Sequence, residues 1–278
     1  FSEAHVTPER YHTLYRQSLD DPDTFWSEQA QLLDWHSPWS AVSETDVAKG
    51  AARWFVDAKL NVSVNCIDRH LPERAHDTAI IWEGDDPDDS QSFTYQELKI
   101  QVCRFANALR AQGIGKGDRV CIYMPMIPEA AFAMLACARI GAIHSVVFGG
   151  FSPEALKDRI NDATCSMVIT ADEGVRGGKT VPLKRNVDAA LAQVDCVDSV
   201  IVVRRTGCET DWVDGRDVWF HDATAAVSDD CEPEWMDSED PLFILYTSGS
   251  TGKPKGVLHA TGGYLLQAAM SMKYVFDY

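Results

Sequence analysis

Short apolar runs alternate with longer helical segments between residues 94 and 203. Runs such as 119–124 and 143–148 have the length and the β-branched and aromatic content of buried strands. The segments between them are about ten residues or longer and repeat their apolar side chains at helical spacing. Parallel strands need a crossover of this kind, so the alternation predicts right-handed βαβ units. We therefore expect an α/β fold with layered parallel sheets flanked by helices.

Local signals set the limits of these elements. Thr94-Tyr-Gln-Glu97 is a capping box that starts one helix, and Ser152-Pro153 caps another. Residues 207–233 are expected to hold short antiparallel pieces without chemistry. The other expected strands are 78–82, 119–124, 143–148, 167–170, 199–203, 242–246 and 257–259, and the expected helices are about 94–113, 128–140, 153–162, 182–194 and 261–273.

Residues 1–66 differ in composition and patterning from the rest of the chain. They contain four of the eight tryptophans at irregular spacing: Trp26, Trp35, Trp39 and Trp54. Helices are expected at about 11–18 and 22–33. Aromatic side chains so placed favour packing over ligand stacking, so this part is predicted to be a small, mostly helical cap on a larger body.

Composition narrows the classes of partner. The net charge is −17, which argues against nucleic acid and anionic membranes. No apolar run reaches the roughly 18–20 residues that a membrane span requires. The eight cysteines are scattered without a C-x-x-C pair, which is typical of reduced core residues and predicts a cytoplasmic protein without disulfides or a zinc site.

A loop rich in glycine, hydroxyl and lysine residues follows the apolar run 242–246. The whole stretch 242–256 reads L-F-I-L-Y-T-S-G-S-T-G-K-P-K-G. Glycines let the backbone approach a ligand, hydroxyls donate hydrogen bonds, and Lys253 and Lys255 add positive charge. Such a loop suits a polyphosphate. It is not a Walker A loop, because Pro254 follows Gly252-Lys253. A flexible surface turn is the alternative, but linkers rarely follow an apolar strand directly.

A second loop, Asp172-Glu-Gly-Val-Arg-Gly-Gly-Lys179, also follows an expected strand. Two glycines separate Arg176 from Lys179, so both charges could face one anion. The residues alone leave two interpretations open, a phosphate site and a solvated basic turn.

Several motifs together resemble one family. They are Tyr246-Thr-Ser-Gly-Ser-Thr-Gly-Lys-Pro-Lys-Gly256, Ile80-Ile-Trp-Glu-Gly84, Tyr123-Met-Pro-Met126, Ala136-Cys-Ala-Arg-Ile-Gly141, Val147-Phe-Gly-Gly-Phe-Ser-Pro-Glu154 and Ala171-Asp-Glu-Gly-Val-Arg176. The first resembles the phosphate loop of the adenylate-forming acyl-CoA synthetase superfamily. The set is similar to the AMP-forming acetyl-CoA synthetases and extends from about Tyr11 to Tyr278.

The resemblance implies a ligase that joins acetate to coenzyme A through acetyl-AMP, using ATP, CoA and Mg²⁺. It implies that the ATP phosphates contact Thr247, Ser248, Gly249, Ser250, Thr251, Gly252, Lys253, Lys255 and Gly256, and that CoA contacts Arg176, Gly177, Gly178 and Lys179. The family often has arginine where this chain has Lys179, and lysine lacks the bidentate geometry of arginine.

The resemblance also implies a division of the chain into a cap (1–66) and the first part of the AMP-binding domain (67–278). The family's adenine and acyl pockets, magnesium ligands and catalytic lysine lie downstream of Tyr278. We therefore expect no catalytic or metal-binding residue here, an inactive fragment when alone, and the remaining C-terminal part as its partner besides acetate, ATP and CoA.

Two alternatives stay open at this stage. The enzyme could prefer propionate or another short acid, because the residues that shape the acyl pocket are not in this chain. In a different class, the chain could be a non-catalytic module that binds a nucleotide or CoA.

Overall fold

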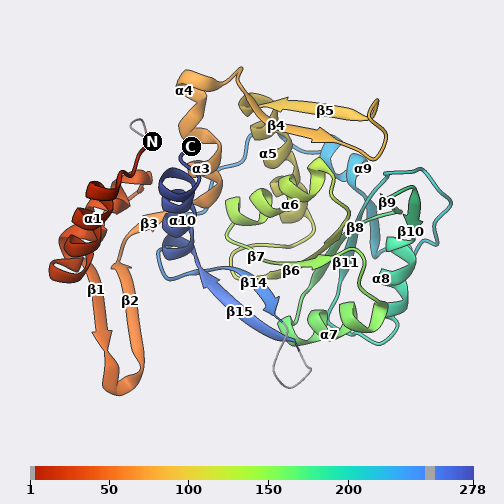
Figure 1. Cartoon of the computed structure of the whole chain (residues 1–278). Coiled ribbons are helices and arrows are strands. Elements are labelled where there is room, and N and C mark those ends of the chain that lie inside the picture. Colours follow the sequence, from red (N-terminus) through yellow and green to blue (C-terminus); the bar gives the residue numbers. More distant parts are fainter. Residues whose placement is uncertain (1–3, 248–253) are drawn as a thin grey trace.

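A seven-stranded sheet lies at the centre of the computed structural model, which describes residues 4–247 and 254–278 (Figure 1). The strand order is β12-β11-β8-β6-β7-β14-β15, and all neighbours are parallel except β14 and β15. The strands are β6 (Arg119–Met124), β7 (Ile143–Phe148), β8 (Met167–Ala171), β11 (Ser199–Val203), β12 (Asp217–Trp219), β14 (Pro241–Thr247) and β15 (Lys255–Ala260). The predicted α/β class is confirmed.

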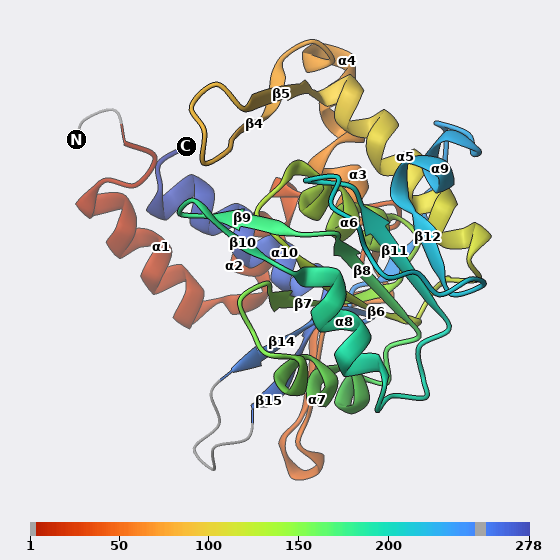
Figure 2. The same cartoon turned by 90° about the vertical axis from the view of Figure 1, so that its right-hand side faces the viewer.

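Helices cover both faces of this sheet (Figures 1 and 2). On one side α5 packs on both α6 and α9, and on the other α7 packs on α8. The chain moves from β6 to β7 in one direction along the sheet and then returns past β6 to β8 in the other. Because crossovers in both directions are right-handed, their helices lie on opposite faces of the sheet. The helices are α5 (Tyr95–Ala111), α6 (Pro128–Arg139), α7 (Pro153–Ala163), α8 (Leu183–Leu191), α9 (Phe220–Ala225) and α10 (Thr261–Met270).

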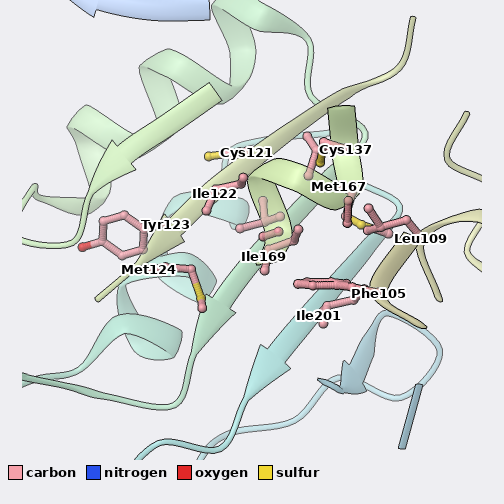
Figure 3. Close-up of a cluster of buried hydrophobic side chains, with 14 of the residues drawn as sticks. Phe105, Leu109, Cys121, Ile122, Tyr123, Met124, Cys137, Met167, Ile169 and Ile201 are labelled. Carbon is pink, nitrogen blue, oxygen red and sulfur yellow. The ribbon is translucent and has the colours of Figure 1, made fainter. Parts of the chain in front are cut away.

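The main core lies between α5, α6 and the middle strands. Figure 3 shows Phe105 and Leu109 of α5 against Ile169 and Ile201 of neighbouring strands. All four side chains are fully buried. The capping box at Thr94 and Glu97 is formed as predicted, and it fixes where α5 begins and therefore which face it buries.

The N-terminal part packs on the end of the chain through aromatic side chains. Trp26 meets Trp54 edge to face, and Trp35 meets Trp39 in the same way. The cluster also includes Leu265 and Leu266 of α10, so the tryptophans are packing residues as expected. The elements here are α1 (Pro8–Asp20), α2 (Pro22–Gln29), β1 (Ala41–Asp46), β2 (Ala51–Val56), β3 (Lys59–Leu60) and α3 (Val62–Cys66). The β1–β2 hairpin was not predicted.

Two expectations about strands were wrong. In β14 only Leu242 is buried, although a buried strand was predicted over 242–246; β14 is next to the sheet edge, and Leu245 is 46% exposed. Within 207–233 the strand β12 pairs parallel, not antiparallel, with β11, because the chain crosses back before it joins the sheet. The remaining elements are α4 (Leu71–Arg74), β4 (Thr78–Glu83), β5 (Ser90–Thr94), β9 (Gly174–Arg176), β10 (Lys179–Val181) and β13 (Met236–Asp237), with short 3-10 or π turns.

Across the described ranges 4–247 and 254–278, no helix combines the length and apolar character that a membrane crossing needs.

Candidate functional site

The expected phosphate loop joins two paired strands. Thr247 at the end of β14 is opposite Lys255 at the start of β15, and Tyr246 is opposite Gly256. Thr247, Lys255 and Gly256 are exposed. Ser248, Gly249, Ser250, Thr251, Gly252 and Lys253 lie outside the described residues. Because β14 is parallel to β7, this connection begins at the carboxyl edge of the sheet, where α/β folds bind ligands.

Helix α7 anchors the strand that leads into this connection. The Tyr246 hydroxyl donates a hydrogen bond of 2.6 Å to Oδ2 of Asp162. The Arg159 guanidinium lies 5.4 Å from the centre of the Tyr246 ring. Burial, and then the bond to Asp162, raise the pKa of the Tyr246 phenol above its ordinary value, so it remains a neutral donor. The position of Thr247 therefore depends on α7.

The expected CoA residues form the tip of the β9–β10 hairpin. Arg176 and Lys179 are opposite each other, and Gly177 and Gly178 form the turn between them. Both glycines have positive φ, 58° and 71°, as a two-residue hairpin turn requires. All four residues are exposed. The structure therefore brings these four residues together, with both cations on one tip.

Neighbouring segments hold this hairpin tip. The Arg176 guanidinium lies 5.0 Å from the centre of the ring of Phe148, the last residue of β7. The backbone N–H of Gly178 donates a hydrogen bond of 3.1 Å to Oδ2 of Asp85, in the turn between β4 and β5. The aspartate-rich turn at 84–90 thus contacts the basic hairpin.

The turn after β7 is shaped by its glycines and by Tyr123. The Tyr123 hydroxyl lies 3.1 Å from the carbonyl oxygen of Gly149 and 2.7 Å from that of Phe151. Asn186 of α8 donates to the same hydroxyl. A Cβ atom on Gly150 would collide with the Phe148 ring, so a larger residue there would force that ring to shift. These glycines serve backbone geometry.

Asp172 is a site residue for which sequence reasoning assigned no role. Its carboxylate is 1% exposed and accepts hydrogen bonds from the backbone N–H groups of Glu173, Arg205, Thr206 and Gly207. It ties the base of the hairpin to the loop after β11. Its place directly after an apolar strand is the signal that could have found it.

The family model described as "AMP-binding enzyme" matches residues 67–278. The chain belongs to the AMP-binding enzyme family. A second model, described as "Acetyl-coenzyme A synthetase N-terminus", matches residues 11–66.

Curated relatives of the chain carry related names. It is 70% identical over 275 residues to acetyl-coenzyme A synthetase 2 of Pseudomonas putida, covering 99% of this chain and 43% of that protein. It is 66% identical to acetyl-coenzyme A synthetase of Saccharophagus degradans, with the same coverage of each chain. The chain thus spans 43% of the length of these curated relatives. The resemblance to acetyl-CoA synthetases is confirmed.

A solved relative has the same architecture. The structure of acetoacetyl-CoA synthetase from Streptomyces lividans superposes with a TM-score of 0.88 at 29% sequence identity. The superposition covers 96% of this chain and 41% of the acetoacetyl-CoA synthetase chain.

Other charged side chains of the chain are paired within the fold. Lys184 is 1% exposed and lies 2.8 Å from Asp188 and 2.9 Å from Asp217, beside a polar cavity of about 340 Å³. Arg139 of the 136–141 motif is 2% exposed and makes two contacts with Asp68, at 2.9 and 3.1 Å. Buried cations with carboxylate partners serve structure, so these residues are not free to bind an anion.

The described part of the chain holds no cluster of three or more His, Cys, Asp or Glu side chains that could bind a metal ion. His144 and His259 stack on opposite sides of Phe243, at 5.5 and 4.5 Å between ring centres. Both histidines pack against this ring.

Proposed function

We propose that this chain is part of an acetate–CoA ligase. Acetate attacks the α-phosphorus of ATP to give acetyl-AMP and pyrophosphate, and the CoA thiol then displaces AMP. The observation that carries this proposal is the 70% identity, over 99% of this chain, to an acetyl-coenzyme A synthetase. Catalysis of such a reaction consists mainly of positioning and charge stabilisation.

The connection from Thr247 to Gly256 is proposed to bind the β- and γ-phosphates of ATP. Support comes from its start at the carboxyl edge of the sheet and from the exposed Thr247 and Lys255 that flank it. Lys253, Ser248, Ser250 and Thr251 enter the proposal by their sequence alone. Bound Mg²⁺ would neutralise part of the triphosphate charge. The described residues offer no cluster to hold it, so the proposal assigns it to no residue here.

The β9–β10 tip is proposed to bind the nucleotide end of CoA through Arg176, Gly177, Gly178 and Lys179. Two exposed cations opposite each other, with two glycines between them, suit a phosphate-rich ligand. Because Arg176 already lies over Phe148, its guanidinium is held in place before the ligand arrives.

The first test is acetate-dependent exchange of pyrophosphate into ATP. It compares this chain with the longest reading frame that contains it, and runs propionate in parallel. We expect exchange from the longer protein, with acetate the better substrate. Lys253→Ala combined with Lys255→Ala should reduce exchange at least about tenfold, because each charged contact with phosphate contributes about 1.5–3 kcal/mol.

Lys49→Ala is the control for this test, since the Lys49 side chain is 81% exposed and forms a surface ion pair of 2.9 Å with Asp46. Unchanged exchange in the double lysine variant would refute the phosphate loop. Faster exchange with propionate than with acetate would identify propionate as the preferred substrate. Saturable CoA binding without exchange by either protein would favour a non-catalytic binding module.

A cytoplasmic location is also part of the proposal. It is supported by eight free thiols, five of them buried, which a reducing compartment would keep reduced.

A further inference from the structure

The two proposed ligand loops are linked by a row of stacked cations and aromatic rings. The row begins at Arg176 on the β9–β10 tip, whose guanidinium lies over Phe148. Phe148 meets Phe151 edge to face, with 5.7 Å between ring centres and an 83° angle between ring planes. Phe151 then lies under a second guanidinium, that of Arg159, at 4.6 Å.

Arg159 completes the row, because the same guanidinium faces Tyr246 at 5.4 Å. Tyr246 directly precedes Thr247, where the proposed phosphate loop begins. Arg159 is 9% exposed, and its Nη1 donates a hydrogen bond of 2.7 Å to the carbonyl oxygen of Ala155 on its own helix. Its guanidinium is therefore fixed by α7 and contacts two rings at once.

Figures 1 and 2 place α7 beside the end of the β14–β15 hairpin in both views. The hydrogen bond from Tyr246 to Asp162 joins the same helix to the same strand. Helix α7 thus contacts the turn next to Arg176 through Phe151 and the strand before Thr247 through Tyr246. A cation held between two rings resists displacement of either one, since the attraction falls when a ring leaves its face.

We propose that Arg159 is a positioning residue that sets the end of β14 at Tyr246, which leads into the proposed ATP phosphate loop, relative to the CoA hairpin. This rests on the proposed function for the identity of the two ligands. The geometry of the row itself is independent of it. Arg159 touches neither ligand in this proposal; it acts through Phe151 and Tyr246.

The kinetic test uses the longest reading frame that contains this chain. Arg159→Met keeps the length of the side chain but removes the cation, and Arg159→Lys restores a cation. We expect Arg159→Met to raise the KM values for ATP and for CoA about fivefold each, with the KM for acetate unchanged, and Arg159→Lys to recover at least half of both effects. Arg74→Met is the control, because it removes another arginine–tyrosine contact, 5.4 Å from Tyr95, on a different helix.

A purely structural role would lower kcat and thermal stability while leaving both KM values unchanged, and that result would overturn the proposal. A KM change for only one of the two ligands would overturn it as well, because the row would then not link the loops.

Hydrogen–deuterium exchange tests the row without any ligand. Arg159→Met should increase exchange in both 148–151 and 241–247 and leave β6 unchanged, whereas Arg74→Met should change neither segment. Unaltered exchange in either segment would refute the positioning role. If the wild-type protein shows no pyrophosphate exchange but both segments respond, the proposed function fails while the positioning role stands.

Discussion

His144 is a buried histidine that the fold holds in its neutral form. The side chain is 8% exposed and stacks on Phe243. Its Nδ1 atom has no hydrogen-bond partner among the residues that the structure describes. Burial lowers the pKa of His144 to about 4 from its ordinary value of 6.5. A proton is therefore bound more readily by the unfolded chain than by the native one.

This difference predicts acid sensitivity. Stability should be fully present above pH 6.5 and decline as the pH falls towards 4, because only the unfolded state gains a proton in that range. His144 should account for a loss of about 3 kcal/mol. Urea unfolding at a series of pH values measures it. His144→Phe should flatten the decline, whereas His12→Phe, at an exposed position, should follow the wild type. Equal slopes for wild type and His144→Phe would contradict the prediction.

The β9–β10 hairpin depends on two consecutive residues with positive φ. Gly177→Asn should be tolerated, because Asn-Gly suits a two-residue turn of this kind. Gly178→Val should disrupt the tip, since a β-branched residue at positive φ is strained by about 1–2 kcal/mol or more. A Cβ at either position meets open space, so crowding does not explain the difference. CoA affinity measured by calorimetry should fall several-fold for Gly178→Val only; similar affinities for both variants would argue against a role for the turn.

Sequence reasoning correctly located the strands whose side chains are nearly all buried in the core. The limits of β6, β7 and β11 were predicted correctly, because continuous apolar runs bounded by polar residues have few other solutions. β5, with the sequence S-Q-S-F-T, was missed because it is largely exposed and lacks alternation. The direction of β12 was wrong because three residues carry no information about their partner strand.

The candidate site could be predicted only as two separate loops. The glycine and lysine pattern identifies a loop, but its neighbours are set by contacts between distant residues. The hydrogen bond between Gly178 and Asp85 joins residues 93 positions apart in the sequence, and the bond between Tyr246 and Asp162 joins residues 84 positions apart. Arg159 carries no local signal, since its role arises only when α7 packs beside β14. The ATP and CoA residues themselves remain predictions.

At the scale of the whole molecule, the distribution of thiols predicts a simple labelling pattern. Five of the eight cysteines are buried, and burial raises the pKa of Cys137 to about 12 and of the partly buried Cys66 to about 11. A thiolate is the reactive form, so these residues should react slowly at pH 8. Mass spectrometry after brief iodoacetamide treatment should find label first on partly exposed Cys208 and Cys196, and all eight sites should react in urea. Early label on Cys137 would contradict the packing described.

The strand order also determines in which order the strands can join the sheet during translation. β6 pairs with both β7 and β8, and β11 joins β8, all before residue 204. Phe243 of β14 pairs with His144, about one hundred residues earlier in the chain. The ribosome therefore releases β14, the strand before the proposed phosphate loop, only after β7, the strand with which it pairs, has been synthesised. Until then the edge of β7 is an open template, and a nascent chain arrested near residue 240 would expose it to chaperones or to other nascent chains.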